Sequence, residues 1–354
     1  MPIDQKSIEA FTINFTSILY EAMPFIVLGV ILSGLLEEFV PQKIVARIIP
    51  RSRVLAIAIG GLLGILFPMC ECGIIPIMRR LLRKGVPLSC CTCYMLAGPI
   101  INVVVMISTF AAFSGTPTGA IYKEEVLDAN KVPHVVTSYP QLGPWWMMGC
   151  RMGLGFLVAF GTSLLVEQQY RKHGNKLLNP LAAPPEQKLP GAADDEDELP
   201  ARKRTFVDRL STITETALHD FVDVTVYLIL GAILASAGRL ILKHDAVEAL
   251  ATNFFLSICV MMALAILLCI CSEADAFVAA SFRMLPPSAK LGFLVLGPML
   301  DLKLYMMYTR VFRPRLIWTI ITSVVVQVFL YALLTHAVIQ YFLAPSSMGS
   351  LPGP

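Results

Sequence analysis

Two short segments of the chain combine thiols with carboxylates and could therefore bind a solute. Their chemistry-bearing residues are Cys70, Glu71 and Cys72 in the first segment, and Cys269, Cys271, Ser272, Glu273 and Asp275 in the second. Thiolates select soft, thiophilic partners such as Zn²⁺, Cu⁺ and trivalent arsenic-like centres. The two segments are therefore predicted to form a binding site for a soft solute.

A second pair of features places a polar side chain three residues after a Gly-Pro dipeptide. The two examples are Gly98-Pro99 with Asn102, and Gly297-Pro298 with Asp301. Proline frees a backbone carbonyl one turn earlier in a helix, so local unwinding would present oxygen atoms beside these polar side chains. We expect both features to face the two thiol-containing segments and to complete the site.

The thiols have three interpretations: packing, a soft-ligand site or a redox pair. Cysteine is often a small buried hydrophobe, and this is the expectation for Cys90, Cys91, Cys150 and Cys259. The C-x-C spacing recurs in both thiol-containing segments, which favours ligand binding there. This spacing is not that of a structural zinc site, and no histidine lies nearby in sequence. We therefore predict no resident metal, no cofactor and no catalytic residues.

The composition indicates a membrane protein with several spans. Of 354 residues, 56% are hydrophobic and 15% are charged, and the mean hydropathy is +0.70. This balance excludes a soluble globular enzyme and a disordered chain, and cysteines within apolar runs exclude a secreted disulfide scaffold. The start of the chain lacks the features of a cleaved signal peptide. The net charge of +3 comes from scattered Lys and Arg, so nucleic acid is not an expected partner.

Six apolar runs are long enough to cross a bilayer once. They cover residues 15–36, 86–113, 145–166, 221–242, 288–308 and 316–336. Two further stretches, 54–84 and 254–283, are each about 30 residues long and are interrupted at 68–76 and 269–277. Proline and glycine in the first interruption, and Ser-Glu-Ala-Asp in the second, indicate that one helix ends and another begins.

The interruptions would place acids at membrane depth, where each charge costs at least ~2.5 kcal/mol. One structural explanation is that Ser272 caps the returning half-helix, with Glu273 and Asp275 in its first turn. Glu71 has no such explanation. Lys303 would need a partner from a neighbouring helix. Further candidates near the span ends, where charged side chains can reach the membrane surface, are Arg151, His219, Asp220 and Asp223.

The two halves of the chain are related to each other. A shift of 199 residues places Cys70 on Cys269, Cys72 on Cys271 and Asn102 on Asp301. We interpret this as duplication, with repeat 1 at residues 1–166 and repeat 2 at residues 211–340. The proline-rich, charged segment 167–210 should be a flexible cytoplasmic linker, and residues 341–354 a disordered tail.

Two topologies compete for the interrupted stretches, which either cross the membrane or dip into it and return. If both dip, one side receives 19 Lys and Arg and the other receives 7, in agreement with the positive-inside rule. If both cross, this bias largely disappears and the fold is an ordinary eight-helix bundle. We favour an all-α integral membrane fold of two inverted repeats, each with three transmembrane helices and one re-entrant hairpin, as in secondary transporters.

Four runs of the sequence resemble one known family. PMCECGIIPIMRRLLRKGVPL, AGPIINVVV, CSEADAFVAASF and LGPMLDLK are similar to the YraQ-like or ArsP-like permeases, a predicted permease family that includes bacterial organoarsenical efflux permeases. The resemblance covers residues 10–112 and 206–340. It implies an integral permease of the bacterial cytoplasmic membrane, and for arsenical-exporting members it implies binding of trivalent organoarsenicals through cysteines.

We therefore predict a multi-pass permease rather than an enzyme. Its expected partners are the lipid bilayer and a small molecule or ion, and a homo-oligomer is left open. Protons would couple transport through Glu71, Glu273, Asp275 or Asp301, since no nucleotide-binding motif is present. The alternatives are an intramembrane redox or metal-dependent enzyme that uses the paired cysteines, and a channel-like or subunit role in a larger assembly.

Overall fold

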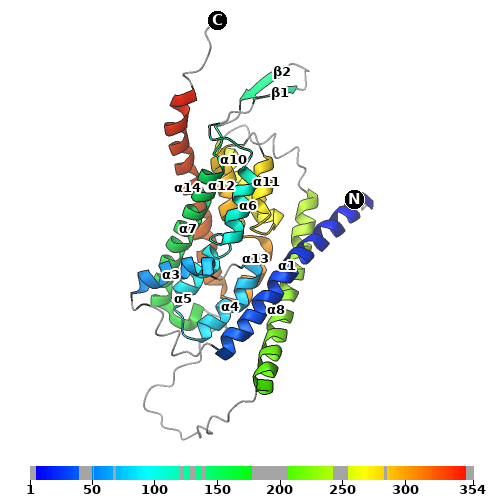
Figure 1. The fold of residues 1–354 in the computed structure, drawn as a ribbon, viewed down its shortest axis with the longest axis vertical. Helices are drawn as coiled ribbons and strands as arrows, with labels where there is room; N and C mark the ends of the chain where they lie inside the picture. The colour runs from blue at the N-terminus through cyan, green and yellow to red at the C-terminus, as the bar shows by residue number, and fades with distance from the viewer. Residues whose placement is uncertain are drawn as a thin grey trace.

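A computed structural model describes residues 5–39, 50, 52–66, 69–119, 123–127, 133–137, 140–177, 206–241, 254–282 and 285–347. The described part is almost entirely helical (Figure 1). Its first half contains α1 (Gln5–Phe39), α3 (Arg53–Leu66), α4 (Glu71–Arg83), α5 (Leu88–Ala97), α6 (Val103–Phe113) and α7 (Pro144–His173). Its second half contains α8 (Phe206–Ile241), α10 (Phe254–Leu268), α11 (Asp275–Ser281), α12 (Pro287–Leu296), α13 (Leu302–Val311) and α14 (Pro314–Ser347). Each half thus places two pairs of short helices between two long ones.

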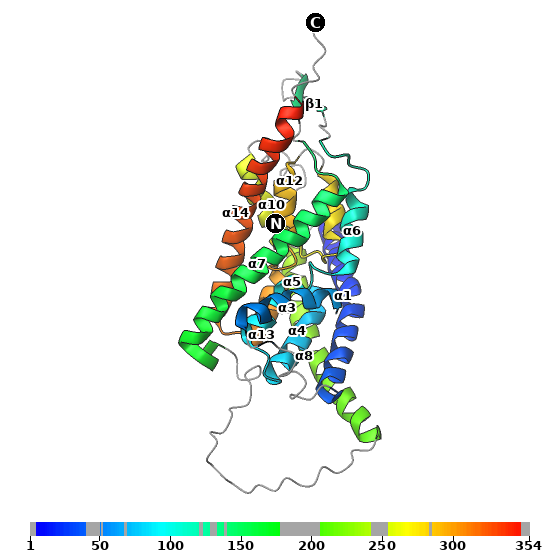
Figure 2. The same ribbon diagram turned by 60° about the vertical axis from the view of Figure 1, so that its left-hand side comes forward.

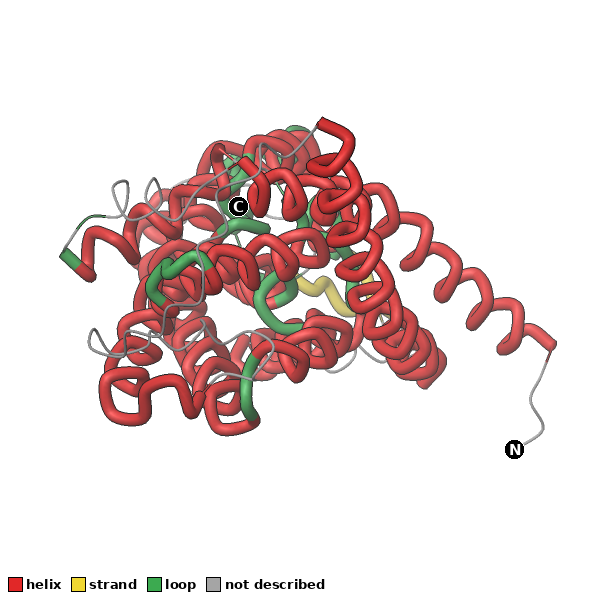
Figure 3. Tube along the Cα trace, turned by 90° about the horizontal axis from the view of Figure 1, so that it is seen from below, coloured by secondary structure: helices red, strands yellow, loops and turns green. Residues whose placement is uncertain are grey.

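Four of the described helices are long and apolar enough to cross a membrane: α1, α7, α8 and α14. They carry exposed apolar side chains such as Ile31, Leu157, Leu230 and Leu330, as expected for helices that face lipid. Helix α1 packs along α8, and α7 packs along α14 (Figures 1 and 2). Viewed along the bundle, the N-terminal end of α1 projects outward from the other helices (Figure 3). The predicted all-helical membrane architecture is confirmed at this level.

Two of the six expected single spans are broken in the middle. The span expected at 86–113 consists of α5 and α6, and the span expected at 288–308 consists of α12 and α13. Both breaks follow a Gly-Pro dipeptide and end at an extended residue, Asn102 or Asp301, that begins the next helix. Because proline has no backbone N–H to donate, helical hydrogen bonding is interrupted at these points.

The first interrupted stretch runs into the protein and returns to the end where it started. Arg53, at the start of α3, forms an ion pair with Glu167 near the end of α7. Ser89, in the first turn of α5, also donates a hydrogen bond to Glu167. Arg53 and Gly85, which follows α4, line the same cavity of about 300 Å³. The outer ends of α3 and α4 therefore lie together, and Met69 and Cys70, just before α4, are buried.

The second interrupted stretch returns to the opposite end of the molecule. Gln141, just before α7, donates a hydrogen bond to the carbonyl of Leu285, which follows α11. At the start of α10, Phe254 stacks on His336 near the end of α14, with ring centroids 4.4 Å apart. Helix α7 has 30 residues and is therefore about 45 Å long. Gln141 and Glu167 thus lie at opposite ends of α7, as do the residues that contact them.

Close backbone contact with α5 requires a glycine in α3. A Cβ atom on Gly64 would lie 2.7 Å from the Cα atom of Gly98 and 2.7 Å from the carbonyl oxygen of Ile101. We expect Gly64→Ala to lower the free energy of unfolding by about 1–3 kcal/mol, since backbone must shift to admit the methyl group. The matched control is Gly153→Ala in α7, where nothing lies within 4 Å. Thermal unfolding in detergent should separate the two variants, and equal melting temperatures would contradict the packing.

Several expected boundaries differ from the observed ones. Strands β1 (Lys123–Leu127) and β2 (Pro133–Thr137) form an antiparallel hairpin between α6 and α7. Helix α7 continues to His173, past the linker start expected at residue 167, because the buried Glu167 is anchored by Arg53 and Ser89. Helix α8 begins at Phe206 rather than 211, and α14 extends to Ser347, past 341. Residues 178–205 and 348–354 lie outside the described part.

Candidate functional site

The inner ends of the two interrupted stretches lie in the middle of the bundle, and an ion pair joins each of them to a helix of the other half. Helix α4 begins at Glu71 with Cys70 as its N-cap, and the chain between α10 and α11 covers residues 269–274. The predicted thiols and acids of the two segments lie at these inner ends, which we call tip 1 (residues 70–72) and tip 2 (residues 269–275). The structure thus brings together the two segments that the sequence singled out.

Lys303, in α13 of the second half, holds tip 1. Its Nζ lies 2.7 Å from Glu71 Oε1 and 3.6 Å from Asp301 Oδ2. The same ammonium lies 3.5 Å from the carbonyl oxygen of Cys269 and 3.9 Å from the Sγ of Cys271. The side chains of Lys303 and Glu71 are 0% and 1% exposed. Charges so deeply buried are tolerated only when paired, so this contact fixes tip 1 to the second half.

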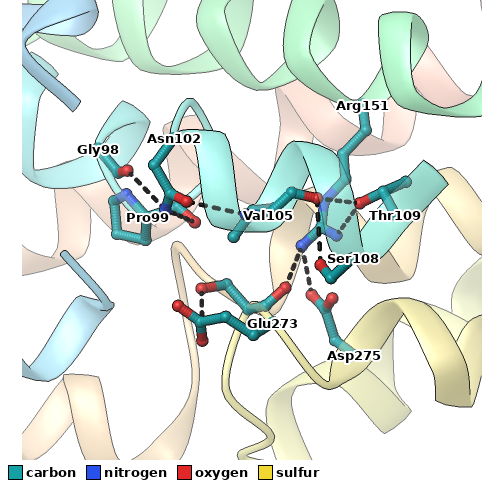
Figure 4. Close-up of polar contacts among 10 residues, drawn as sticks. Gly98, Pro99, Asn102, Val105, Ser108, Thr109, Arg151, Glu273 and Asp275 are labelled. Atoms are coloured by element: carbon teal, nitrogen blue, oxygen red, sulfur yellow. Dashed lines mark hydrogen bonds and ion pairs between the residues drawn. The ribbon is translucent and has the colours of Figure 1, made fainter. Parts of the chain in front are cut away.

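Arg151, in α7 of the first half, holds tip 2 (Figure 4). Its Nη2 donates to Asp275 Oδ2 at 2.7 Å and to the carbonyl oxygen of Ser272 at 3.0 Å. Its Nη1 donates to Thr109 Oγ1, in α6, at 2.7 Å. Arg151 is completely buried. The fork of its guanidinium therefore ties two helices of the first half to the hairpin of the second.

These two contacts are reciprocal. In each, a buried basic side chain from one half binds a carboxylate at the hairpin tip of the other half: Lys303 with Glu71, and Arg151 with Asp275. Both ion pairs lie in an interior formed mainly by apolar side chains. A change of charge at either tip would therefore alter how firmly the two halves are joined.

Asn102 and Asp301, expected to contact the solute, serve as helix N-caps. Asn102 Oδ1 accepts a hydrogen bond from the backbone N–H of Val105, and Asp301 Oδ1 accepts one from that of Leu304. The amide nitrogen of Asn102 donates to the carbonyl oxygens of Gly98 and Pro99, at 3.4 Å each (Figure 4). Gly297 and Pro298 are buried in the equivalent break of the second half. Both side chains satisfy backbone groups that the breaks leave free, and the second Asp301 oxygen also reaches Lys303.

The expected cap at Ser272 is wrong. Helix α11 begins after Ala274, which has no side chain able to cap it, and the Ser272 hydroxyl lies 3.5 Å from Glu273 Oε2 instead. Asp275 is in the first turn of α11, where a negative charge is favourable, but its strongest contact is with Arg151. Glu273 is only partly buried. The acids of tip 2 are therefore more than capping groups.

The four thiols of the tips are buried and reduced. Cys269 has a backbone φ of 49°, in the left-handed region that non-glycine residues seldom adopt. This conformation ends α10 and turns the chain into tip 2. Among the described residues, no group of three or more His, Cys, Asp or Glu side chains is arranged to hold a metal ion.

The remaining cysteines and polar candidates lie elsewhere. Cys90, Cys91 and Cys93 are buried along α5, while Cys259 is exposed on α10 and Cys150 is half-buried on α7. His219 is exposed on α8, and the side chains of Asp220 and Asp223 lie outside the described part. The sequence did not predict which carboxylates pair with the two buried basic side chains, Lys303 and Arg151. The only available signal was the occurrence of an uncompensated Lys303 and Arg151 within apolar segments.

Comparison with known proteins identifies the family. The profile of a family described as "Predicted permease" matches residues 7–122 and 131–337. UPF0718 protein YcgR of Bacillus subtilis (strain 168) is 36% identical over 321 residues, which cover 90% of this chain and 95% of that protein. A protein of Streptococcus mutans serotype c, provisionally named a two-component membrane permease complex subunit, is 29% identical over 324 residues, with coverages of 90% and 93%.

No solved structure matches this fold. The family profile covers both halves of the chain and includes both hairpin tips and both Gly-Pro breaks. Permeases are transporters rather than enzymes, in agreement with the apolar helices of the bundle. The chain belongs to the predicted permease family, and it is a multi-pass membrane protein.

Proposed function

We propose that this protein is a secondary transporter of the bacterial cytoplasmic membrane, with its substrate site between tip 1 and tip 2. In this proposal the two hairpins are re-entrant, and the two halves are inverted repeats that pack around the site. The observation that carries it is the pair of reciprocal buried ion pairs, Lys303 with Glu71 and Arg151 with Asp275. Broken helices that meet at membrane depth are typical of substrate sites in secondary transporters.

The chemistry of the tips supports a soft solute as the substrate. Cys70 and Cys72 flank Glu71, and Cys271 Sγ lies 3.9 Å from the Lys303 ammonium that pairs with Glu71. Soft ligands such as thiols favour thiophilic centres. A trivalent organoarsenical or another metalloid is the class that fits these thiols. Export would be coupled to protons that bind the carboxylates of the tips, namely Glu71, Glu273, Asp275 or Asp301.

The test is export of trivalent methylarsenite from cells and its uptake into inside-out vesicles. We expect Cys70→Ser/Cys72→Ser to lose nearly all resistance and flux, because serine keeps the size of the side chain but not its affinity for soft centres. The matched control is Cys259→Ser, since Cys259 is exposed on the outside of α10 and should leave flux unchanged. Unchanged flux in the double variant would overturn the role of the thiols.

A second candidate is a subunit role in a two-component transporter, and it is favoured by the name of the Streptococcus mutans relative. In this case the tips would still form the substrate path, but flux would require a second protein. Purified chain reconstituted alone into liposomes should move methylarsenite if the first proposal holds. Flux that is present in cells but absent from these liposomes would support the subunit role instead.

A further inference from the structure

The ammonium of Lys303 lies in a cage of acceptors that would suit a cation in its place. The cage consists of Glu71 Oε1 at 2.7 Å, the Cys269 carbonyl oxygen at 3.5 Å, Asp301 Oδ2 at 3.6 Å and Cys271 Sγ at 3.9 Å. One acceptor comes from tip 1, two come from tip 2 and one begins α13. We call this set the Lys303 cage.

We infer that the Lys303 cage is a binding site for a small monovalent cation, occupied in this conformation by the protein's own ammonium group. The inference rests on the proposed function, since it names a cationic ligand for the same site between tip 1 and tip 2. A cation that enters the site between the tips would compete with the Lys303 ammonium for the cage. Its binding would therefore release the contact between Lys303 and Glu71 that holds tip 1.

The balance of charge supports a cationic ligand. Among the described residues, the two tips and the side chains that hold them carry four carboxylates and two basic groups. The carboxylates are Glu71, Glu273, Asp275 and Asp301, and the basic groups are Lys303 and Arg151. Buried charges require compensation. The site between the two tips therefore favours binding of a cation and repels a free anion.

Unused acceptor atoms support the same conclusion. Glu71 Oε2, Asp301 Oδ2 and Asp275 Oδ1 are buried and accept no hydrogen bond from any described residue. Glu71 and Asp301 are each 1% exposed, so surface water does not reach these oxygens. Natural structures seldom leave such atoms unsatisfied unless a ligand, ion or water completes them. Of the three, Asp301 Oδ2 belongs to the Lys303 cage, and Glu71 Oε2 is the second oxygen of a carboxylate in the cage.

The side chain of Lys303 is flexible enough for its ammonium to leave the cage while α13 stays in place. Its backbone packs directly on α8, where a Cβ atom on Gly231 would lie 2.5 Å from the Cα atom of Lys303. The four-carbon stem between this fixed backbone and the ammonium has several rotatable bonds. An entering cation can therefore displace the ammonium without moving α13. The thiol of Cys271 in the cage favours a soft cation over a hard one of equal size.

The test is thermal unfolding of the detergent-purified full chain with Lys303→Ala, which empties the cage. The variant is titrated with methylammonium, Tl⁺ and K⁺ nitrate. We expect saturating methylammonium or Tl⁺ to raise its melting temperature by about 5 °C, since a ligand that binds only the folded state stabilises it. Tl⁺ and K⁺ have nearly the same radius, so a larger shift with Tl⁺ reports the contribution of the thiol. Wild-type protein, in which a cation must first displace the ammonium, should respond only at higher cation concentrations.

The matched control is Lys290→Ala. Lys290 is also a buried lysine, but its Nζ donates to the neutral amide oxygen of Gln141 at 2.6 Å. Its removal leaves the Lys303 cage filled by the Lys303 ammonium, so we expect no cation-dependent shift at the same concentrations. If Lys303→Ala responds to the cations no more than Lys290→Ala does, the inference is overturned and Lys303 is a fixed structural partner.

A second variant guards against failure of Lys303→Ala to fold. Compared with Lys303→Ala, the variant Lys303→Ala/Asp301→Asn has one unpaired carboxylate fewer. Asparagine can still cap α13, as Asn102 caps α6. The double variant should fold and show the same cation response through Glu71. These measurements need no substrate. Absence of methylarsenite flux alone would contradict the proposed function. Absence of a cation-dependent shift in melting temperature would contradict only the inference that the Lys303 cage binds a cation.

Discussion

Replacing Lys303 by glutamate is expected to prevent folded protein from accumulating in the membrane. The substitution would place a third carboxylate beside Glu71 and Asp301, in a space where Lys303 and Glu71 are 0% and 1% exposed. Removal of one partner from a buried ion pair costs about 3–5 kcal/mol, and reversal of its charge adds repulsion to that cost. This is comparable to the total stability of many proteins. The measurement is the monodisperse fraction in gel filtration after detergent extraction.

The charge exchange Glu71→Lys/Lys303→Glu provides the control for this prediction. It keeps one positive and one negative charge across the contact between tip 1 and α13. We expect it to recover a substantial part of the folded protein, although the lysine would then face the amino-terminal end of α4, where a positive charge is unfavourable. Normal accumulation of Lys303→Glu alone would contradict the buried pair.

Arg151→Met is expected to abolish transport and to lower the free energy of unfolding by about 3–5 kcal/mol. Methionine fills a similar volume, but it leaves Asp275 without a counter-charge and removes two hydrogen bonds to tip 2 and one to Thr109 within the first half. The variant Arg151→Met/Asp275→Asn removes the unpaired charge and should recover stability. It should not recover transport, since the contact that joins the halves is still missing.

A basic residue on the same helix provides the comparison for Arg151→Met. Arg171 pairs with Glu167 four residues earlier, and its side chain is 62% exposed. Exposed ion pairs contribute little, about 0–1 kcal/mol. Arg171→Met should therefore melt close to the wild-type temperature and transport normally. If Arg151→Met behaved like Arg171→Met in unfolding and flux assays, the role of Arg151 in holding tip 2 would be contradicted.

The positions of the helix breaks could be predicted from local sequence. Residues 68–76 combine proline, glycine and charge, and the hairpin begins its return at Glu71. Residues 269–277 contain Ser-Glu-Ala-Asp, and α11 begins at Asp275. Such signals act within one or two turns of a helix, so they can be recognised without knowledge of the surroundings. The same holds for the Gly-Pro dipeptides that end α5 and α12.

The contacts that form the site could not be predicted in this way. Lys303 binds Glu71, which is more than two hundred residues away in the chain, and Arg151 binds Asp275, which is also distant. A single sequence does not reveal which buried charges meet. Local competition also misled the prediction: Asn102 and Asp301 satisfy free N–H groups of the next helix, so their oxygens serve as caps. Ser272 was also expected to cap a helix, but α11 begins after Ala274.

The central claim is that both hairpins turn back within the bilayer from opposite sides, and side-specific labelling tests it most directly. Single cysteines would replace Ser52 and Lys84, at the two outer ends of the first hairpin, in a variant without accessible native thiols. Ser114 after α6 and Ser281 at the end of α11 serve as markers for the opposite end of the bundle. A membrane-impermeant maleimide is then applied to right-side-out or inside-out vesicles.

We predict that cysteines at positions 52 and 84 react only in inside-out vesicles, and those at 114 and 281 only in right-side-out vesicles. Reaction of positions 52 and 84 from opposite sides would mean that the first stretch crosses the membrane. The two tips would then not enter the bilayer from opposite faces, and the proposed site would be contradicted.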